Sequence, residues 1–198
     1  MSGPSQSDDV ERFDRWSSTY ESSWMQGLFF DRVHRAVLDA VAAQARPQVL
    51  LDIGCGTGRL LRCAARRWPE AQLIGVDPAP GMVRVASRLL PQATFQSGPA
   101  EQLPLPDASV DVAMSTMSFH HWQSQVAGLR EIARVLRSGG CFVLADASVP
   151  AWWGRIDHGA RFHDPVTLRR LMQAATLVVL GQRRSFLGHI IVTVSKRD

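Results

Sequence analysis

The sequence predicts an α/β protein built on a doubly wound, mostly parallel sheet of seven strands, with helices on both faces. From residue 48 onward, short apolar runs alternate with segments in which apolar residues recur at helical spacing, which is the pattern of β-α units. The last two runs, 176–182 and 189–195, are separated by only a few residues. So short a connection fits an antiparallel pair, and the last strand is therefore expected to run antiparallel to the others.

Five further apolar runs fit the parallel strands of this sheet. They occupy residues 48–53, 72–77, 94–97, 110–115 and 141–145, of which 94–97 is a short strand with Phe95 as its one apolar residue. Amphipathic helices are expected between and after them, over residues 59–68, 82–90, 126–136 and 168–175. The run Ser138, Gly139 and Gly140 is expected to end the third helix, and a loop with three prolines spans 99–107. In such a sheet, ligands bind at the carboxyl ends of the strands.

The chain is expected to divide into three parts. Residues 1–9 are small and polar and predict a disordered tail. Residues 10–47 predict an N-terminal helical cap, because apolar or aromatic residues recur at helical spacing at 10, 13, 16 and 20 and again over 33–41. Residues 48–198 then form the domain that contains the sheet, and their number is enough for one sizeable core.

Composition places the chain among globular proteins, with 45% hydrophobic and 20% charged residues. No run approaches the ~20 apolar residues of a membrane helix, and the first residues lack the layout of a signal peptide, so a cytoplasmic location is expected. The net charge of +4 comes from scattered arginines, which fits a solvated surface better than a face that binds nucleic acid. Three cysteines, at 55, 63 and 141, lack the spacing of a metal or disulfide site.

A glycine-rich turn comes after the first expected strand. Gly54, Gly56 and Gly58 stand directly after the apolar run, and helical spacing resumes at Leu60. Glycines let the backbone approach a ligand, and the N–H groups at the start of the helix point into the same space. Asp77 ends the second strand, 19 residues after Gly58, where a carboxylate can accept hydrogen bonds from ribose hydroxyls. This combination predicts a site for an adenosine-bearing ligand.

Two common nucleotide sites do not fit this turn. The nicotinamide fingerprint requires a third glycine, but that position is Arg59 when counted from Gly54 and Leu61 when counted from Gly56. The phosphate-binding pattern that ends in Gly-Lys-Ser/Thr is also absent. Asp52 lies just before the glycines, and a carboxylate there fits a ligand cation or ammonium group better than a pyrophosphate.

Taken together, these stretches resemble the class I S-adenosylmethionine-dependent methyltransferases, and most closely the branch of ubiquinone/menaquinone-type small-molecule methyltransferases. Residues 50–58 (Leu-Leu-Asp-Ile-Gly-Cys-Gly-Thr-Gly) match the first motif of that family, 75–78 with Met82 match the second, and 100–111 match the third. Residues 119–122 and 131–140 match the family's segments after the third motif. The resemblance implies a Rossmann-like fold, S-adenosylmethionine as cofactor, and in-line transfer of a methyl group to O, N or C of a small molecule.

The resemblance also implies which residues hold the cofactor. Asp52 and the glycine turn would bind the methionine part, Asp77 the ribose hydroxyls, and Met82 the adenine. Pro99 departs from the family pattern, because it replaces an Asp that bonds the adenine amino group and offers neither a carboxylate nor an N–H. The cofactor-binding residues expected in this way, including an aromatic residue that closes over the cofactor, are Tyr20, Asp52, Gly54, Cys55, Gly56, Asp77, Pro78, Met82, Ala100, Glu101 and Ser115.

His120 is the candidate catalytic residue. It comes after the fourth expected strand together with His121, and histidine is the side chain best suited to take a proton near neutral pH. A base is needed only where the acceptor must lose a proton, so the alternative is that His120 orders its loop. No metal site is expected, because His158 and His163 have no carboxylate pair at metal spacing and Asp146 stands alone.

The expected partner is a small-molecule acceptor, whereas the oligomeric state is left open by the sequence. Trp152, Trp153 and Phe162 favour an aromatic or apolar acceptor, although packing explains them equally well. Two other functions remain open. One is a cofactor-binding protein of the same fold that transfers no methyl group. The other is a nicotinamide-dependent oxidoreductase, which Arg59 and the presence of a single tyrosine, Tyr20, disfavour.

Overall fold

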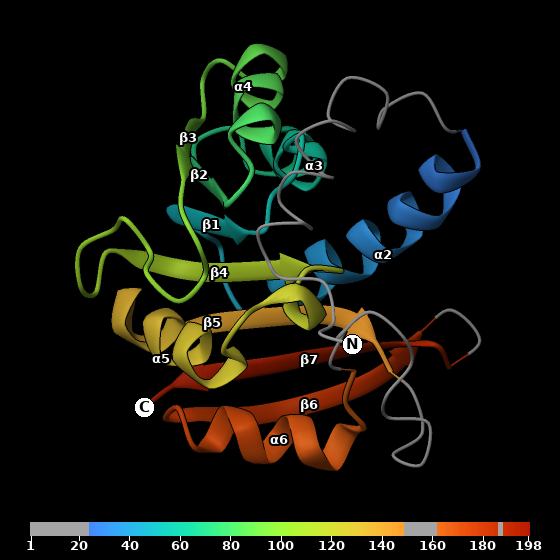
Figure 1. Cartoon of the computed structure of the whole chain (residues 1–198), viewed down its shortest axis with the longest axis vertical. Coiled ribbons are helices and arrows are strands. Elements are labelled where there is room, and N and C mark those ends of the chain that lie inside the picture. Colours follow the sequence, from blue (N-terminus) through green and yellow to red (C-terminus); the bar gives the residue numbers. More distant parts are fainter. Residues whose placement is uncertain (1–23, 149–161, 186–187) are drawn as a thin grey trace, which may run out of the picture.

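The computed structural model describes residues 24–148, 162–185 and 188–198, with side chains from residue 30 onward. Within these ranges the chain forms one seven-stranded sheet flanked by helices (Figure 1). The strands are β1 (Val49–Ile53), β2 (Gln72–Asp77), β3 (Thr94–Ser97), β4 (Val110–Thr116), β5 (Leu136–Ala147), β6 (Leu177–Ser185) and β7 (Ile190–Arg197). The helices are α2 (Trp24–Ala42), α3 (Arg59–Arg67), α4 (Pro80–Leu89), α5 (Gln125–Val135) and α6 (Pro165–Gln173).

The order of strands in the sheet is β3-β2-β1-β4-β5-β7-β6. The pairs from β3 to β5 are parallel, and β7 runs antiparallel to both β5 and β6. This confirms the expected fold class, including the antiparallel last strand. The chain reverses its direction of winding between β1 and β4, so the carboxyl ends of β1, β2 and β4 surround the topological switch point, where this kind of sheet binds its ligands.

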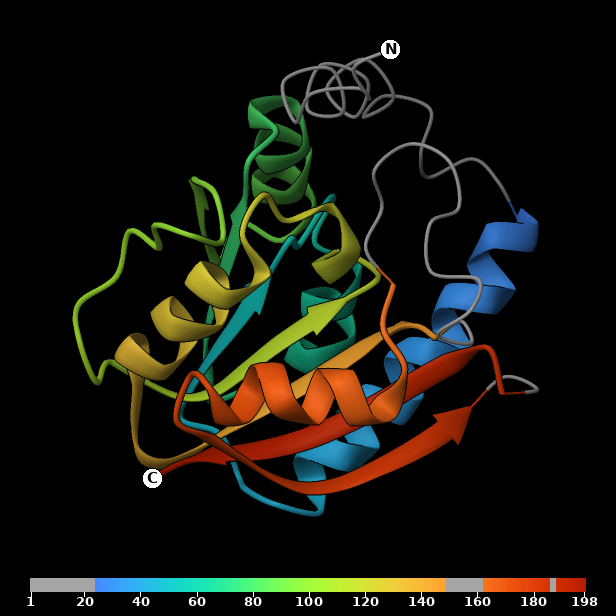
Figure 2. The ribbon, with the colours of Figure 1, turned by 60° about the horizontal axis from the view of Figure 1, so that its bottom comes forward.

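Two layers of helices bury the two faces of the sheet. Buried residues of α2 and α3 pack with Leu50 and Met114 on one face, whereas residues of α5 and α6 pack with Leu51 and Phe142 on the other. Consecutive residues of β1 therefore enter different cores, as strand geometry requires. In Figure 2, α2 passes behind β5 and β7, on the side of the sheet opposite α6.

α2 is an integral part of this arrangement. Val33, Val37 and Val41, which are spaced along one face of the helix, are almost completely buried in the core beneath β4 and β5. Packing of this kind fixes the position of the other side chains of α2 relative to the sheet edge. The helix is longer at its amino end than the periodicity over 33–41 indicated.

Several element boundaries differ from their predictions by a few residues, and the largest difference lies between α5 and β5. Leu136 was expected in a helix that the run 138–140 would end, but α5 ends at Val135 and β5 already begins at Leu136. Leu136 pairs with Val110, and the register between β4 and β5 then shifts before Cys141 pairs with Val112. Gly139, with φ of 73°, lies within this irregular part of the strand. The apolar spacing was misleading because Leu136 is buried, and a buried leucine fits the last turn of an amphipathic helix as well as the start of a buried strand.

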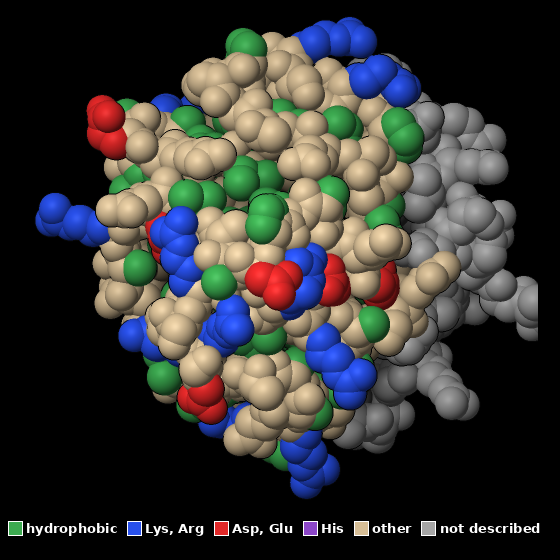
Figure 3. All heavy atoms as spheres, turned by 90° about the vertical axis from the view of Figure 1, so that its left-hand side faces the viewer, with side chains coloured by type: hydrophobic (Ala, Val, Ile, Leu, Met, Phe, Trp, Pro, Cys, Tyr) green, Lys and Arg blue, Asp and Glu red, His purple; other side chains and the backbone are tan. Residues whose placement is uncertain are grey.

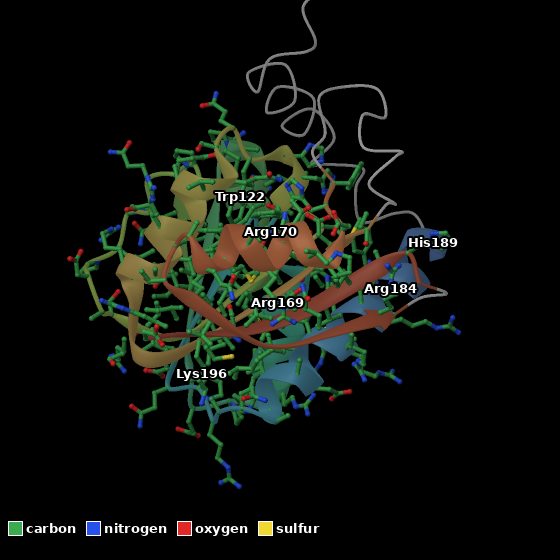
Figure 4. All side chains as sticks on the ribbon, turned by 90° about the horizontal axis from the view of Figure 1, so that it is seen from below. Trp122, Arg169, Arg170, Arg184, His189 and Lys196 are labelled. Carbon is green, nitrogen blue, oxygen red and sulfur yellow. The ribbon has the colours of Figure 1, made fainter. Side chains whose placement is uncertain are left out.

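Charge on the surface is dispersed. The face in Figure 3 carries interspersed basic and acidic side chains without a continuous stripe of one sign. In Figure 4, Arg169 and Arg170 come from α6, Arg184 from β6 and Lys196 from β7, so the basic residues of the C-terminal part are spread over three elements. No helix among the described residues has both the length and the apolar character that a membrane span requires.

Candidate functional site

A large cavity opens at the switch point of the sheet. It encloses about 1110 Å³ of empty space, part of it open to solvent. Its lining comes from the ends of β1, β2 and β4, from the loops after β1, β2, β3 and β4, and from α2. The cavity thus lies where the carboxyl ends of three parallel strands meet, the position at which sheets of this kind bind their ligands.

The glycine turn after β1 forms the floor of this cavity, and its three glycines have different roles. All three have positive φ, which favours glycine. A Cβ on Gly54 would stand 1.9 Å from Ser118 Oγ, and one on Gly58 would stand 3.0 Å from the Phe95 ring. A Cβ on Gly56 would meet no atom within 4 Å. Gly54 and Gly58 therefore permit close packing, whereas Gly56 leaves space for a ligand.

Asp77 connects the end of β2 to this turn. Its Oδ2 accepts a hydrogen bond from the Gly56 N–H at 2.8 Å, and its Oδ1 accepts one from the Ala79 N–H at 2.9 Å. Burial raises the pKa of this carboxyl group, and the two backbone hydrogen bonds oppose that shift. Each carboxylate oxygen keeps further lone pairs, so Asp77 is held in place and can still accept hydrogen bonds from ligand hydroxyls.

Asp52 faces the same cavity from the end of β1. Its side chain is 2% exposed, and burial together with the neighbouring Asp77 carboxylate raises its pKa to about 8. Two buried carboxyl groups at one site repel each other when both are ionised, and a cationic ligand relieves that repulsion. The acid pair therefore suits a ligand with a positively charged group next to a polyhydroxyl group.

The side of the cavity near β2 and β3 is largely apolar. Pro78, Met82, Gly98 and Ala100 line it, and the Gly98 N–H donates to the Asp77 carbonyl at 3.1 Å. Pro99 is exposed and does not line the cavity. A flat base in this position would be held by apolar contacts and backbone groups, consistent with the lack of an acid at residue 99.

The structure brings together most of the cofactor-binding residues expected from the sequence. Eight of them line the cavity, namely Asp52, Gly54, Cys55, Gly56, Asp77, Pro78, Met82 and Ala100. Glu101 does not line it, because its Oε1 accepts a hydrogen bond from the Ser124 N–H at 2.9 Å at the start of α5. Ser115 is fully buried within β4 and also lies outside the lining. Tyr20 falls outside the described residues, as do Trp152, Trp153 and His158.

His120 lies next to the cavity wall rather than on it. It belongs to a short 3-10 helix, η2 (Phe119–His121), after β4, and His121 lines the cavity in its place. The Nδ1 atom of His120 lies 2.7 Å from Asp146 Oδ1, and its backbone N–H donates to Asp146 Oδ2 at 3.0 Å. The centroid of its ring lies 4.1 Å from that of the His121 ring and 4.6 Å from that of the Phe162 ring. Asp146 at the end of β5 thus fixes both the backbone and the ring of His120.

Several lining residues were missed by the sequence analysis. Phe30 and His34 come from α2, and Arg59 comes from the first turn of α3. Thr116 ends β4, and Met117 follows it directly. Met117 has φ of 53°, an uncommon conformation for a residue with a side chain and one that often marks a functional site. The i, i+4 spacing of Phe30 and His34 was the available signal, but spacing alone does not show which side of a helix faces a cavity.

Within the ranges that the structure describes, no group of three His, Cys, Asp or Glu side chains comes close enough to hold a metal ion. His163, one of the histidines considered for such a site, has its Nε2 2.6 Å from the Gln125 side-chain oxygen.

Comparisons with known proteins agree with this geometry. A family profile described as a methyltransferase domain matches residues 51–144. A malonyl-[acyl-carrier protein] O-methyltransferase of Dechloromonas aromatica is 30% identical over 193 residues, which cover 92% of this chain and 70% of that protein. A demethylmenaquinone methyltransferase of Chlorobaculum parvum is 31% identical over 146 residues, or 70% of this chain and 59% of that protein. The chain thus spans about three-fifths to seven-tenths of these relatives' lengths.

A solved structure supports the same fold. It is described as an S-adenosylmethionine-dependent methyltransferase, possible histamine N-methyltransferase, of Thermotoga maritima. The TM-score is 0.72 and the sequence identity 22%, and the match covers 94% of this chain and 98% of the other. At this level of identity the likeness concerns the fold.

Proposed function

Because the chain belongs to the class I S-adenosylmethionine-dependent methyltransferases, we propose that its cavity binds S-adenosylmethionine and a small-molecule acceptor side by side. The observation that carries this proposal is the placement of Asp52 and Asp77 at one cavity, with Asp77 hydrogen-bonded to the backbone of Gly56. When bound, the cofactor supplies a methyl group on a sulfonium centre, which is open to in-line displacement. The protein's own contribution is to hold the two ligands in line and to exclude water.

The residues present fit this cofactor. The Asp77 carboxylate, fixed by two backbone N–H groups, suits the ribose hydroxyls. Asp52, buried beside it, suits the ammonium group of the methionine part. The open space at Gly56 allows the ligand to lie against the backbone of the turn, and the apolar wall with Met82 and Ala100 suits the adenine.

The identity of the acceptor is not given by family membership. The two relatives above are named for acceptors as different as a malonyl-[acyl-carrier protein] and demethylmenaquinone. In this chain, Phe30, Met117 and Trp122 line the cavity together with polar groups. We propose a small acceptor with an apolar part.

Calorimetry with S-adenosylhomocysteine tests the cofactor site. We expect binding to the wild-type protein, and an affinity about 10- to 100-fold lower for Asp77→Asn, because a hydrogen bond to a charged group contributes about 1.5–3 kcal/mol. Asp164→Asn is the matched control, because Asp164 caps α6 through the N–H groups of Val166 and Thr167 and does not line the cavity. Equal binding by wild type and Asp77→Asn would contradict the proposed site.

Product detection separates methyl transfer from cofactor binding alone. If S-adenosylhomocysteine forms with any acceptor in a panel of small acids, phenols, amines and quinols, the protein is a transferase. If the protein binds S-adenosylhomocysteine but no acceptor is methylated, the alternative of a binding protein with the same fold gains support.

We propose that His120 takes a proton from the acceptor, or positions the group that does. With Nδ1 donating to the Asp146 carboxylate, Nε2 is the nitrogen left to accept a proton. We expect His120→Ala to lower kcat with a changed pH profile, and Asp146→Asn to have a smaller effect in the same direction. His121→Ala is the comparison, because His121 lines the cavity. Turnover of His120→Ala that equals wild type at every pH would exclude the base role.

A further inference from the structure

The wall of the cavity formed by α2, the start of α3 and the end of β4 has a chemistry different from that of the acid pair. We call it the α2 wall and define it by Phe30, His34, Arg59, Thr116 and Met117, all of which line the cavity. The pair Phe30 and His34 stands one helical turn apart, with ring centroids separated by 5.8 Å. The α2 wall thus combines apolar surface with three side chains that can donate hydrogen bonds.

Two of these three side chains each have a buried polar atom that makes no hydrogen bond. Among the described residues, three side-chain N or O atoms are buried without a hydrogen bond, and two of them are His34 Nδ1 and Thr116 Oγ1. The His34 residue is only 6% exposed. An unpaired buried polar group is costly to a fold. Neither of these two atoms makes a hydrogen bond within the protein. Either side chain can therefore rotate toward a ligand in the cavity without breaking a hydrogen bond of that atom.

Arg59 adds a positive charge to the same wall. Its Nη2 donates to Asp31 Oδ1 at 3.1 Å across the α2–α3 contact, and this is one of the five N–H donors that a guanidinium carries. Asp31 is exposed to solvent, so the ion pair is weak. The remaining donors of Arg59 are available to a ligand in the cavity that it lines.

His34 is uncharged at neutral pH. Burial lowers its pKa to about 4, and the positive charges of Arg59 and Arg62 act in the same direction, against Asp31. A neutral imidazole donates one hydrogen bond and accepts one. The wall therefore offers one charged donor, Arg59, and two neutral groups able to donate, His34 and Thr116, whereas the carboxylates of the cavity lie at the ends of β1 and β2.

We propose that the α2 wall is the acceptor subsite and that it recognises an anionic oxygen group, such as a carboxylate, on the methyl acceptor. Arg59 supplies the charge, His34 and Thr116 supply hydrogen bonds, and Phe30 with Met117 packs against the apolar part of the acceptor. This inference rests on the proposed function, in which the cofactor occupies the side of Asp52 and Asp77. The cavity is then divided into an acidic half for the cationic cofactor and a basic half for an acidic acceptor.

A matched pair of probes tests the charge preference. Phenylacetate and phenylacetamide have the same shape, but only the first is an anion at pH 7.5. Their dissociation constants are measured by calorimetry on the wild-type protein, both saturated with S-adenosylhomocysteine and free of it. We expect phenylacetate to bind about tenfold more tightly or better, because charge-assisted hydrogen bonds are roughly twice as strong as neutral ones. Equal binding of acid and amide overturns the proposal.

Variants of the α2 wall show which residues cause the preference for phenylacetate over phenylacetamide. Arg59→Gln and His34→Phe should reduce the advantage of phenylacetate to about threefold or less, and Thr116→Val should reduce it by a smaller factor. Arg67→Gln is the matched control, because Arg67 pairs with Asp39 across the same two helices but does not line the cavity. We expect it to leave both probes unaffected. An equal loss in Arg67→Gln would assign the effect to helix packing and contradict the proposal.

Thermal melting provides a readout that a purely structural role would not produce. Thr116→Val removes a buried hydroxyl that has no partner, so the ligand-free variant should melt at the same or a higher temperature while binding phenylacetate less well. A lower melting temperature together with unchanged binding would identify Thr116 as a structural residue. Since Arg59 and Thr116 variants test the wall independently of His34, the outcome does not depend on whether His34→Phe folds.

The cofactor's own carboxylate is the competing occupant of this wall. S-adenosylhomocysteine carries that carboxylate, whereas 5′-methylthioadenosine lacks the amino-acid part. If Arg59→Gln weakens S-adenosylhomocysteine but not methylthioadenosine, and leaves phenylacetate unchanged, the wall binds the cofactor and the inference is wrong. If the wild-type protein binds no S-adenosylhomocysteine, the proposed function fails, and the titrations without it still decide whether the wall prefers anions.

Discussion

The two halves of the cavity differ in how their polar groups are held. On the β1–β2 side, Asp77 accepts hydrogen bonds from Gly56 and Ala79, so the site is formed by local backbone contacts. On the α2 wall, His34 Nδ1 and Thr116 Oγ1 have no partner among the described residues. On the β1–β2 side, the polar groups are held in place before a ligand binds. On the α2 wall, the polar groups gain hydrogen bonds only when a ligand binds.

Backbone strain gives the largest expected effect on the β1–β2 side. Gly54→Ala places a Cβ 1.9 Å from Ser118 Oγ at a φ of 71°, and we expect a loss of about 3–5 kcal/mol in the free energy of unfolding, measured by urea denaturation. Gly139→Ala is the control for positive φ alone, since its Cβ meets nothing within 4 Å, and it should lose about 1–2 kcal/mol. Equal losses would show that Ser118 moves aside freely.

The acid pair should be a source of instability in the ligand-free protein. The pKa of Asp52 is raised from 3.8 to about 8 in the fold, so the unfolded chain binds fewer protons between these values and stability falls as pH rises from about 4 to 8. We therefore expect Asp52→Asn to stabilise the free protein at pH 8, by on the order of 2 kcal/mol. Melting curves of wild type and variant at pH 5 and pH 8 measure this, and a difference that does not grow with pH would contradict it.

The same carboxyl group should make cofactor affinity depend on pH. A cationic ligand requires ionised Asp52, which is mostly protonated below its pKa of about 8. The dissociation constant for S-adenosylhomocysteine should therefore fall as pH rises from 6 to 8, by up to about tenfold per unit. Calorimetry across this range should show a flat profile for Asp52→Asn. A flat profile in the wild type would mean that Asp52 is not coupled to the ligand.

The ion pairs between α2 and α3 should give the smallest effect. Asp31 pairs with Arg59 and Asp39 with Arg67, and all four side chains are substantially exposed. We expect Asp31→Asn and Asp39→Asn each to change the free energy of unfolding by less than about 1 kcal/mol. If only Asp31→Asn changes the binding of phenylacetate, the effect comes from Arg59, which lines the cavity, and not from Arg67, which does not.

The elements that the sequence predicted well are those whose signal is local. Two strands, Gln72–Asp77 and Thr94–Ser97, have the expected bounds, because a residue that breaks a strand follows each of them, Pro78 the first and Gly98 the second. Glu101 and Ser115 were placed at the cofactor by family resemblance alone. In the structure the Glu101 carboxylate accepts a hydrogen bond from the Ser124 N–H and does not line the cavity, because side-chain direction depends on contacts from distant parts of the chain. The role expected for Ser115 runs through its backbone and stays a prediction.

The sequence by itself determined the sheet, the glycine turn and the pairing of that turn with Asp77, because each depends on residues close together in the chain or at a spacing that the β-α unit fixes. Only the tertiary structure decided that Gly56 faces a ligand while Gly58 packs against Phe95. It also decided that His121, not His120, reaches the cavity. The α2 wall joins residues 30, 34, 59, 116 and 117, and its composition depends on how helices pack on the sheet, which no local pattern encodes.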